Sequence, residues 1–281
     1  MRVQKNNLLL LACLSAGKTA VPLSPRYGRA HVEKIRRAAG LSCILTEQGP
    51  LTVGIPSPEE ETLEGIRLIL YTSGTTGVPK GAMLADDGLL VNLLAVEGYF
   101  DIRGQIRIAR PLYHCAVLMG EFFLSLVKGV DIVFDGGDFQ PLRLLDAIEE
   151  DWTTVLCGTP TLFYLLCGAA RRRGRVLPLH SAAVSGECMT PSVAVRMREA
   201  MPETVIYHVY GLTEASPRVA YQISSQSDAP LSAGRPLLSV RLGILREDKT
   251  ITSSGQGELL VQGPNVMKGY LNDPEATARA L

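Results

Sequence analysis

A decapeptide rich in glycine and hydroxyl residues, at positions 72–81, constrains this chain more than any other feature of its sequence. It follows directly on residues 66–71, an apolar run that is typical of a buried strand. Glycines at 74, 77 and 81 permit positive φ angles and let backbone N–H groups approach an anion closely. The hydroxyls add donors, and Lys80 adds a compact positive charge. The segment is therefore suited to hold a chain of phosphates.

The decapeptide differs from the common P-loop, because the pattern GxxxxGK[ST] is absent. Residues 81–84 are typical of a strand, and a helical pattern starts only at about Asp87. We therefore expect the loop to join two strands. The alternative interpretation is a hairpin turn rich in Gly and Thr that carries an exposed lysine.

Composition excludes several classes of protein. The 281 residues allow one large domain or two modest ones, and 46% hydrophobic with 20% charged residues is typical of a globular protein. Basic and acidic residues balance at 28 each, so no basic surplus exists for a nucleic acid or an anionic membrane. Six cysteines without a CxxC pair lie mostly in apolar runs, which favours buried side chains in a reducing compartment over a zinc site. The expected location is the cytoplasm.

The amino terminus has two interpretations. Arg2 and Lys5 precede an apolar run at 8–14, as in a lipoprotein signal sequence that ends at Cys13. The run is at the lower limit for such a signal, and the sequence favours a helix over 6–16 followed by a short buried strand at 20–23. No other stretch is long and apolar enough to span a bilayer.

The chain beyond this point alternates strands with helices, the pattern of an α/β fold. A loop is expected over 49–61, a solvated loop over 171–175, and Thr190 as a helix cap. From residue 231 the pattern changes to short strands with Gly and Pro turns, so we expect an α/β part over 1–228 and a β subdomain over 229–281. The predicted helices are 31–39, 141–150, 160–166 and 191–200, and the predicted strands are 43–46, 131–134, 153–156, 182–184, 205–207, 240–245 and 258–262.

The decapeptide with Tyr71 before it resembles the signature of the adenylate-forming superfamily, which comprises acyl- and aryl-CoA ligases, adenylation domains of peptide synthetases, and luciferases. Further segments support this resemblance in the family order, and together they cover nearly the whole chain: 12–17 through 21–23, 111–114, 185–187, 210–215, and 257–259 through 269–270. The resemblance implies the large N-terminal domain of such an enzyme, with layered α/β sheets, helices and the start of a small β-barrel.

The resemblance also implies roles for individual residues. The β- and γ-phosphates of ATP would lie against Thr72, Ser73, Gly74, Thr75, Thr76, Gly77 and Lys80. The adenine would lie against Ser185, Gly186, Glu187, Tyr210 and Gly211. Thr213 would lie near the α-phosphate, Glu214 would bind Mg²⁺, and His114 would lie beside the carboxylate substrate. The catalytic set is Lys80, His114, Thr213 and Glu214, and the acyl pocket adds Val209 and Leu212 to His114. Taken singly, Tyr210 and Glu214 are ordinary packing or surface residues and His114 a core histidine; the ordered set of motifs favours the functional roles.

The reaction implied is attack of a carboxylate on the α-phosphate of ATP, which gives an acyl-adenylate and pyrophosphate, followed by transfer of the acyl group to a thiol. No covalent protein nucleophile is required, and catalysis rests on positioning and charge stabilisation. The segments at 73–77, 210–214 and 263–270 favour a ligase that uses CoA and acts on a fatty or other apolar acid. The alternatives are an adenylation domain of a peptide synthetase, which Gly186 and Glu187 also suit, and a luciferase-like enzyme.

Some positions depart from the family pattern. Leu281 precedes the place of the ribose-binding aspartate, the hinge and the mobile C-terminal domain with its catalytic lysine, and Met1 falls inside the pattern. Lys18 and residues 85–88 also differ from the usual residues. The expectation is that residues 1–281 are an incomplete core domain of a ligase; the alternative is a noncatalytic protein that binds a nucleotide or an acyl group. The sequence does not specify an oligomeric state.

Overall fold

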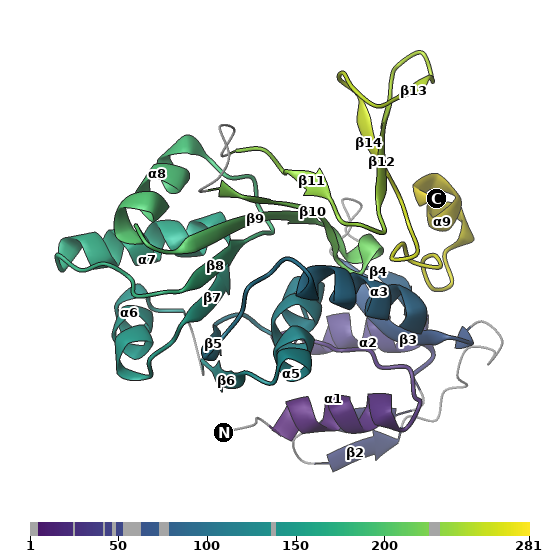
Figure 1. Cartoon of the computed structure of the whole chain (residues 1–281). Helices are drawn as coiled ribbons and strands as arrows, with labels where there is room; N and C mark the ends of the chain where they lie inside the picture. Colours follow the sequence, from purple (N-terminus) through teal and green to yellow (C-terminus); the bar gives the residue numbers. More distant parts are fainter. Residues whose placement is uncertain are drawn as a thin grey trace.

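A mixed sheet of seven strands forms the centre of the fold (Figure 1). The computed structural model describes residues 5–24, 26–41, 43–46, 49–52, 63–72, 79–135, 139–224 and 231–281. The sheet order is β11-β10-β9-β8-β7-β5-β6, in which the five strands from β6 to β9 are parallel and β10 and β11 are antiparallel at one edge. The strands are β5 (Gln105–Ile108), β6 (Asp131–Phe134), β7 (Val155–Gly158), β8 (Ser181–Val184), β9 (Val205–Gly211), β10 (Arg218–Ile223) and β11 (Arg235–Pro236).

Three helices cover one face of this sheet and start in the same way. Each has a proline in its first turn, where the missing N–H removes no hydrogen bond. Leu156 and Ile206 point from the strands into the buried cluster that these helices form, while their neighbours Val155 and Tyr207 belong to the cluster on the opposite face. This alternation is the period of two that a strand imposes on its side chains. The helices are α6 (Pro141–Glu150), α7 (Pro160–Arg172) and α8 (Pro191–Ala200).

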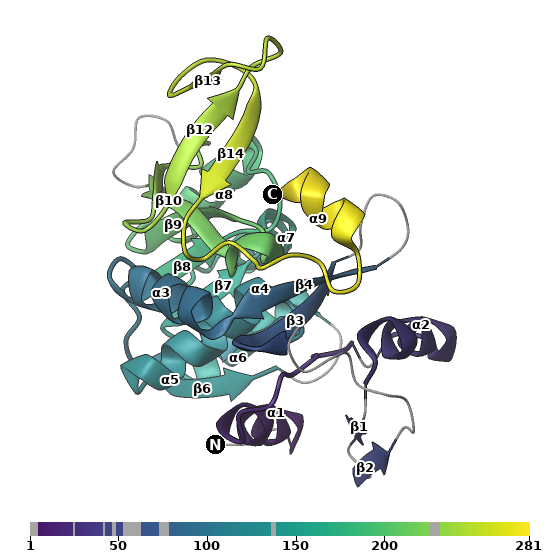
Figure 2. The same ribbon diagram turned by 90° about the vertical axis from the view of Figure 1, so that its right-hand side faces the viewer.

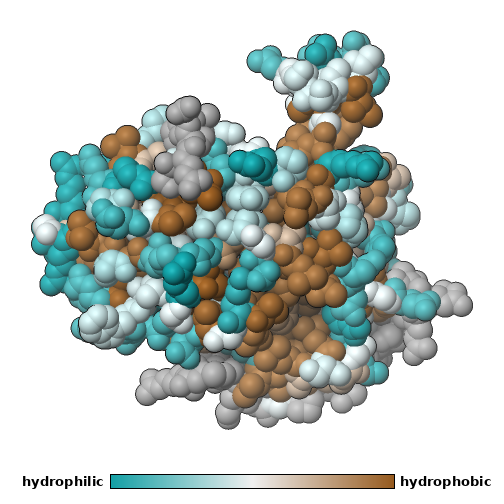
Figure 3. Space-filling view, viewed as in Figure 1, coloured by the Kyte–Doolittle hydropathy of each residue, from teal (hydrophilic) through white to brown (hydrophobic). Residues whose placement is uncertain are grey.

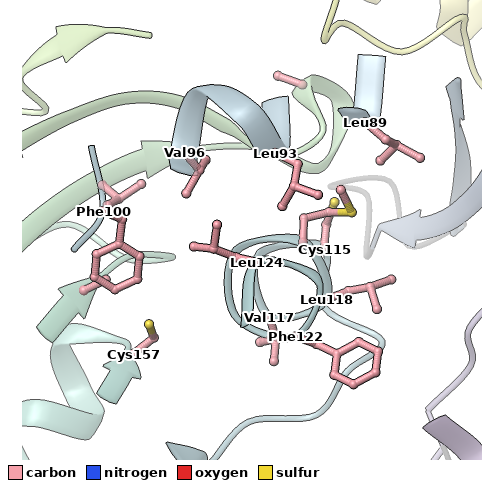
Figure 4. Close-up of a cluster of buried hydrophobic side chains, with 14 of the residues drawn as sticks. Leu89, Leu93, Val96, Phe100, Cys115, Val117, Leu118, Phe122, Leu124 and Cys157 are labelled. Carbon is pink, nitrogen blue, oxygen red and sulfur yellow. The ribbon is translucent and has the colours of Figure 1, made fainter. Parts of the chain in front are cut away.

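Helix α3 and a continuous helical segment cover the other face. In Figure 4, Leu89, Leu93 and Val96 of α3 point toward the segment that carries Leu118 and Leu124. The segment includes a π-helix, a rare conformation that is frequent at functional sites. Its parts are α4 (Cys115–Val117), η2 (Leu118–Phe123) and α5 (Leu124–Lys128), and α3 is Asp86–Glu97.

Helices α3 and α5 also carry apolar side chains on their outer faces. Leu90 and Leu94 of α3 and Leu126 and Val127 of α5 are exposed. Figure 3 shows hydrophobic residues gathered over the region of these two helices. Their apolar residues therefore extend around more of each helix than the sheet covers.

A separate hairpin carries the two ends of the glycine and hydroxyl decapeptide. β3 (Ile66–Thr72) and β4 (Lys80–Ala85) are antiparallel, and Thr72 pairs with Lys80. The prediction that the loop joins two strands is confirmed. Ala20 forms an isolated bridge with Leu68 on one side, and Tyr270 forms one with Ala82 on the other. In Figure 2, the yellow segment that follows β14 passes β4 before it turns into α9.

The C-terminal part forms a three-stranded antiparallel sheet in the order β13-β12-β14. The strands predicted at 240–245 and 258–262 are confirmed as β12 (Arg241–Leu245) and β14 (Glu258–Gln262). The predicted boundary between residues 228 and 229 lies outside the described residues. β13 is Ile251–Thr252, and the chain ends with α9 (Pro274–Ala280).

The structure corrects two predictions in the first 60 residues. Of the strand expected at 20–23, only Ala20 pairs, in its isolated bridge. Residues 49–52, which lie in the expected loop, form β2 (Gly49–Thr52), antiparallel to β1 (Cys43–Thr46). The rest of that expected loop, 53–61, lies outside the described residues. The first two helices, α1 (Lys5–Ser15) and α2 (Arg29–Ala39), agree with the predictions.

Further corrections concern polar residues. Helix α7 extends through Arg172, so the arginine cluster begins inside a helix, and Arg173 pairs with Asp146 of α6. Thr190 is the N-cap residue of α8, as predicted, but its side chain makes no capping hydrogen bond, and its hydroxyl lies 3.1 Å from Ser192 Oγ. Cys43 and Cys188 are exposed, not buried in an apolar environment.

Among the described residues, no helix is long and apolar enough to cross a membrane.

Candidate active site

The carboxyl ends of the parallel strands bring the predicted adenine residues to one edge of the large sheet. Residues 185–187 follow β8, and Tyr210 and Gly211 end the neighbouring strand β9. The Ser185 N–H donates to the carbonyl of Gly158, at the end of β7, at 3.0 Å. In open α/β sheets, ligands bind outside these ends. The predicted adenine residues therefore lie on adjacent strands at a place where a ligand is expected.

Glu187 is held by the first turn of α7. Its carboxylate accepts hydrogen bonds from Thr161 Oγ1 at 2.6 Å and from the Thr161 N–H at 3.3 Å. A carboxylate is favoured at this end of a helix, where the N–H groups lack partners. Ser185 is buried, whereas Gly186 and Glu187 are exposed. The three residues thus form a fixed turn with an exposed end.

The turn after β9 depends on Gly211. A Cβ at this position would lie 2.1 Å from the carbonyl oxygen of Pro217, so a side chain has no room. Tyr210, just before it, is 36% exposed. Thr213 and Glu214 follow in the short 3₁₀ helix η3 (Thr213–Ala215), and both are partly exposed. The close approach of Gly211 to the backbone of Pro217 therefore leaves Tyr210 and Glu214, on either end of this turn, at the surface.

Three segments far apart in the sequence meet at Glu214. The hydroxyl of Tyr270 donates to Glu214 Oε1 at 2.7 Å, and the Met267 N–H donates to the Glu214 carbonyl at 2.8 Å. Lys80 Nζ lies 5.3 Å from the centre of the Tyr270 ring. The structure thereby places the lysine of the decapeptide and the acidic residue of the second motif next to the same tyrosine.

The donor set at Glu214 fits Mg²⁺. Within the described part of the chain, no lysine, arginine or histidine forms an ion pair with this carboxylate. Mg²⁺ prefers oxygen ligands and is usually held by one or two carboxylates together with the phosphates of a substrate. Glu214 would supply the carboxylate oxygen, and the ammonium of Lys80, which lies over the ring of Tyr270, would supply positive charge for the phosphates.

His114 begins the helical segment that ends in α5. Its N–H donates to the carbonyl of Pro111 at 3.3 Å, and its ring contacts that of Tyr113 at a centroid distance of 4.4 Å. Although the side chain keeps contact with solvent, partial burial and then the charge of Arg110 lower the pKa of its imidazole. The next residue, Cys115, has a thiol pKa raised by burial and by the negative charge of Glu214. This first turn therefore lies in the electrostatic field of the Glu214 carboxylate.

The remaining predicted site residues belong to the acyl pocket or to the phosphate-binding loop. Val209 is 3% exposed and packs in the buried cluster around α3 and η2, with Leu212 partly buried against it. Thr72 is the last residue of β3, and Lys80 is the first residue of β4. The other loop residues, Ser73, Gly74, Thr75, Thr76 and Gly77, lie outside the described residues.

A buried group of charges beside this site was not predicted from the sequence. Glu121, in η2, is completely buried and accepts a hydrogen bond from Arg110 Nη2 at 2.6 Å. Arg218 is also buried, and its Nη1 donates to the hydroxyl of Tyr99 at 3.2 Å. Burial raises the pKa of Glu121, and Arg110 opposes this effect. No hydrogen-bond partner is described for four buried atoms of the group: Glu121 Oε2, Arg110 Nε, Arg218 Nε and Arg218 Nη2.

Two buried asparagines hold the turn that follows Glu214. Asn92 Nδ2 donates to the carbonyl of Arg218 at 2.7 Å, and Asn265 Nδ2 donates to the carbonyl of Ala215 at 2.8 Å. A sequence signal for Asn92 exists, because it interrupts an otherwise apolar run over 89–96. The backbone around the acidic residue is thus fixed from two directions.

Replacing Asn92 by alanine is expected to lower the free energy of unfolding by about 1–3 kcal/mol, because buried backbone groups lose their partner. Urea unfolding would measure the loss, with Leu94→Ala, an exposed position on the same helix, as the control. Equal stability of the two variants would show that the hydrogen bonds of Asn92 do not stabilise the fold.

Comparisons with known proteins agree with this geometry. Residues 51–271 match the family described as AMP-binding enzyme. A feruloyl-CoA synthase from Amycolatopsis sp is 30% identical over 97% of this chain and 60% of that protein, so the chain spans about 60% of its length. Tyrocidine synthase 3 from Brevibacillus parabrevis is 25% identical over 95% of this chain and 4% of that protein.

A solved structure shares the fold. O-succinylbenzoate coenzyme A synthetase from Bacillus subtilis, in complex with ATP and a magnesium ion, superimposes with a TM-score of 0.79 at 22% identity over 97% of this chain and 61% of that chain. The predicted fold class, the large domain of an adenylate-forming enzyme, is confirmed. With the family match over most of its length, the chain belongs to the AMP-binding enzymes.

Proposed function

We propose that the protein containing this chain activates a carboxylic acid with Mg-ATP, releases pyrophosphate, and transfers the acyl group from the adenylate to CoA. The observation that carries the proposal is the convergence of Lys80, Tyr270 and Glu214 beside the strand end that presents Tyr210. These groups suit the three parts of Mg-ATP. Lys80 supplies a cation for phosphate, Glu214 a carboxylate for Mg²⁺, and Tyr210 an exposed aromatic ring for the base.

Each residue of the site is assigned to one part of Mg-ATP. Tyr210 stacks on the adenine, in a pocket shared with Ser185, Gly186, Glu187 and Gly211. Lys80 and the loop from Thr72 to Gly77 bind the β- and γ-phosphates, and Thr213 contacts the α-phosphate. Glu214 holds Mg²⁺, which supplies positive charge against the phosphates when it is bound.

The acid lies beside His114 in this proposal. Because the pKa of this imidazole is lowered, the ring is neutral near pH 7 and donates a hydrogen bond without protonating the carboxylate. The carboxylate oxygen then attacks the α-phosphorus, and the bond to the departing pyrophosphate breaks. Lys80 stabilises the charge on the pyrophosphate, so catalysis consists of alignment and electrostatics.

The proposal also names the thiol acceptor and the class of acid. CoA is supported by the 30% identity to a feruloyl-CoA synthase, and the apolar side chains of Val209 and Leu212 support an acid with an apolar body. The alternative, a peptide synthetase adenylation domain, is supported by the match to tyrocidine synthase 3. Formation of acyl-CoA, as opposed to an acyl group on a carrier protein, distinguishes the two. The assignment to the cytoplasm stays a prediction.

Binding of Mg-ATP to the chain tests the nucleotide site. We expect saturable binding by calorimetry, with a dissociation constant raised about tenfold or more in Lys80→Ala, because a charge-assisted contact contributes about 1.5–3 kcal/mol. Lys34→Ala, at an exposed position on α2, is the matched control and should bind as the unmodified chain does. Absence of saturable binding, or equal effects of the two substitutions, would contradict the assignment.

A further inference from the structure

Tyr270 contacts both charged groups of the proposed site, and nothing in the reaction assigns it a role. We propose that Tyr270 is a positioning residue, which orients the carboxylate of Glu214 for Mg²⁺ and holds Lys80 at a fixed separation from it. This inference rests on the proposed function of the site.

The backbone at Tyr270 is fixed from two sides. It runs beside β4, where the Met83 N–H donates to Gly269 at 2.9 Å and the Leu271 N–H donates to Gly81 at 2.8 Å. The Tyr270 N–H itself donates to Thr277 Oγ1, in α9, at 2.9 Å. The tyrosine is therefore carried on an added strand that is joined to the hairpin of Lys80.

The hydroxyl of Tyr270 determines which carboxylate oxygen is available. It donates to Glu214 Oε1 at 2.7 Å, which leaves Oε2 for a cation. A tyrosine hydroxyl is protonated at neutral pH and a carboxylate can only accept, so Tyr270 is the donor in this contact. A hydrogen bond of this kind to a metal ligand restricts its rotamers and orients it before the metal binds.

The ring of Tyr270 contacts the second charged group, the ammonium of Lys80. Lys80 Nζ lies 5.3 Å from its centre, within the range of a cation–π contact. Lys80 and Glu214 both contact this tyrosine, and a direct ion pair between them would withdraw both charges from the nucleotide. In the part of the chain that the structure describes, neither Lys80 nor Glu214 takes part in an ion pair. Each group therefore contacts Tyr270 and is left available for ATP or Mg²⁺.

Two substitutions separate the hydroxyl from the ring. Tyr270→Phe removes only the hydroxyl, and we expect the Mg²⁺ concentration for half-maximal binding of a fluorescent ATP analogue to rise about tenfold, the effect typical of losing such a partner. Affinity at saturating Mg²⁺ should not change. Tyr270→Leu also removes the ring, and affinity should then fall even at saturating Mg²⁺. Tyr164→Phe, on α7, is the matched control and should match the unmodified chain.

A double-mutant cycle shows whether Tyr270 acts through Glu214. In a Glu214→Gln background, Tyr270→Phe should cause no further change in the Mg²⁺ dependence. An unchanged Mg²⁺ requirement in Tyr270→Phe alone, or an equal effect in both backgrounds, would overturn the inference and leave the proposed function standing. If the unmodified chain binds no Mg-ATP, the proposed function fails instead. Urea unfolding of each variant identifies a loss of fold, which would alter the binding capacity and not the Mg²⁺ midpoint.

Discussion

Replacing Glu214 by glutamine is expected to lower the rate of acyl-adenylate formation by about 100-fold or more, the scale observed when a preorganised electrostatic group is removed from an active site. Glutamine keeps the size of the side chain and still accepts a hydrogen bond from Tyr270. It lacks the negative charge that Mg²⁺ prefers in a ligand. The rate of pyrophosphate release at saturating Mg-ATP and acid, in the protein that contains this chain, measures the effect.

Glu275→Gln is the control for this substitution, because Glu275 is an exposed residue of α9 and is not part of the site. It should leave the rate unchanged. If Glu214→Gln were as active as this control at every Mg²⁺ concentration, Glu214 would not be the metal ligand.

Replacing Arg110 by methionine is expected to destabilise the fold by about 3–5 kcal/mol, the cost of leaving a buried charge without its partner. Glu121 is completely buried, and the only hydrogen bond described for its carboxylate comes from Arg110. The double variant Arg110→Met with Glu121→Gln should recover part of the loss, because it removes the charge. Urea unfolding measures all three proteins.

The destabilisation by Arg110→Met should depend on pH in a defined direction. Burial raises the pKa of Glu121, and loss of Arg110 removes the nearest group that lowers it. The folded state then binds a proton at a pH where the unfolded chain, with a pKa of about 4.3, has released it, so stability falls as pH rises through the folded-state pKa. The loss should therefore be larger at about pH 8 than at about pH 5.

Arg103→Met is the control for the buried pair, because Arg103 forms an exposed ion pair with Asp101. Such pairs contribute about 1 kcal/mol or less. A loss for Arg110→Met no larger than for this control, at either pH, would contradict a structural role for the buried charges.

The sequence predicted the parts of the fold in which local pattern and tertiary structure agree. The proline-initiated helices and the short apolar strands of the large sheet are of this kind, as is the hairpin that ends in Thr72 and Lys80. β2 was missed because Gly49 and Pro50 are typical of turns, and its pairing with β1 is a contact that no local pattern reveals. The helical segment from Cys115 was missed because Gly120 and Glu121 interrupt its apolar run.

The site was predicted unevenly for a related reason. Motifs located Tyr210, Glu214 and Lys80, because each belongs to a short segment with its own pattern. Tyr270 lies in a segment that contributed to the resemblance, yet its contact with Glu214 joins residues 56 positions apart and arises only in the folded chain. The charges at Glu121 and Arg218 were missed for the same reason, since neither lies in a recognisable pattern and burial alone makes them notable.

Acid-dependent release of pyrophosphate from Mg-ATP is the most direct test of whether the protein that contains this chain forms an acyl-adenylate. The protein that contains this chain would be supplied with Mg-ATP, CoA and a panel of aryl, short-chain and long-chain carboxylic acids. We expect that at least one acid causes release of pyrophosphate with equal amounts of AMP and acyl-CoA. Saturable binding of Mg-ATP without pyrophosphate release from any acid in the panel would contradict it, and would favour a noncatalytic nucleotide-binding protein.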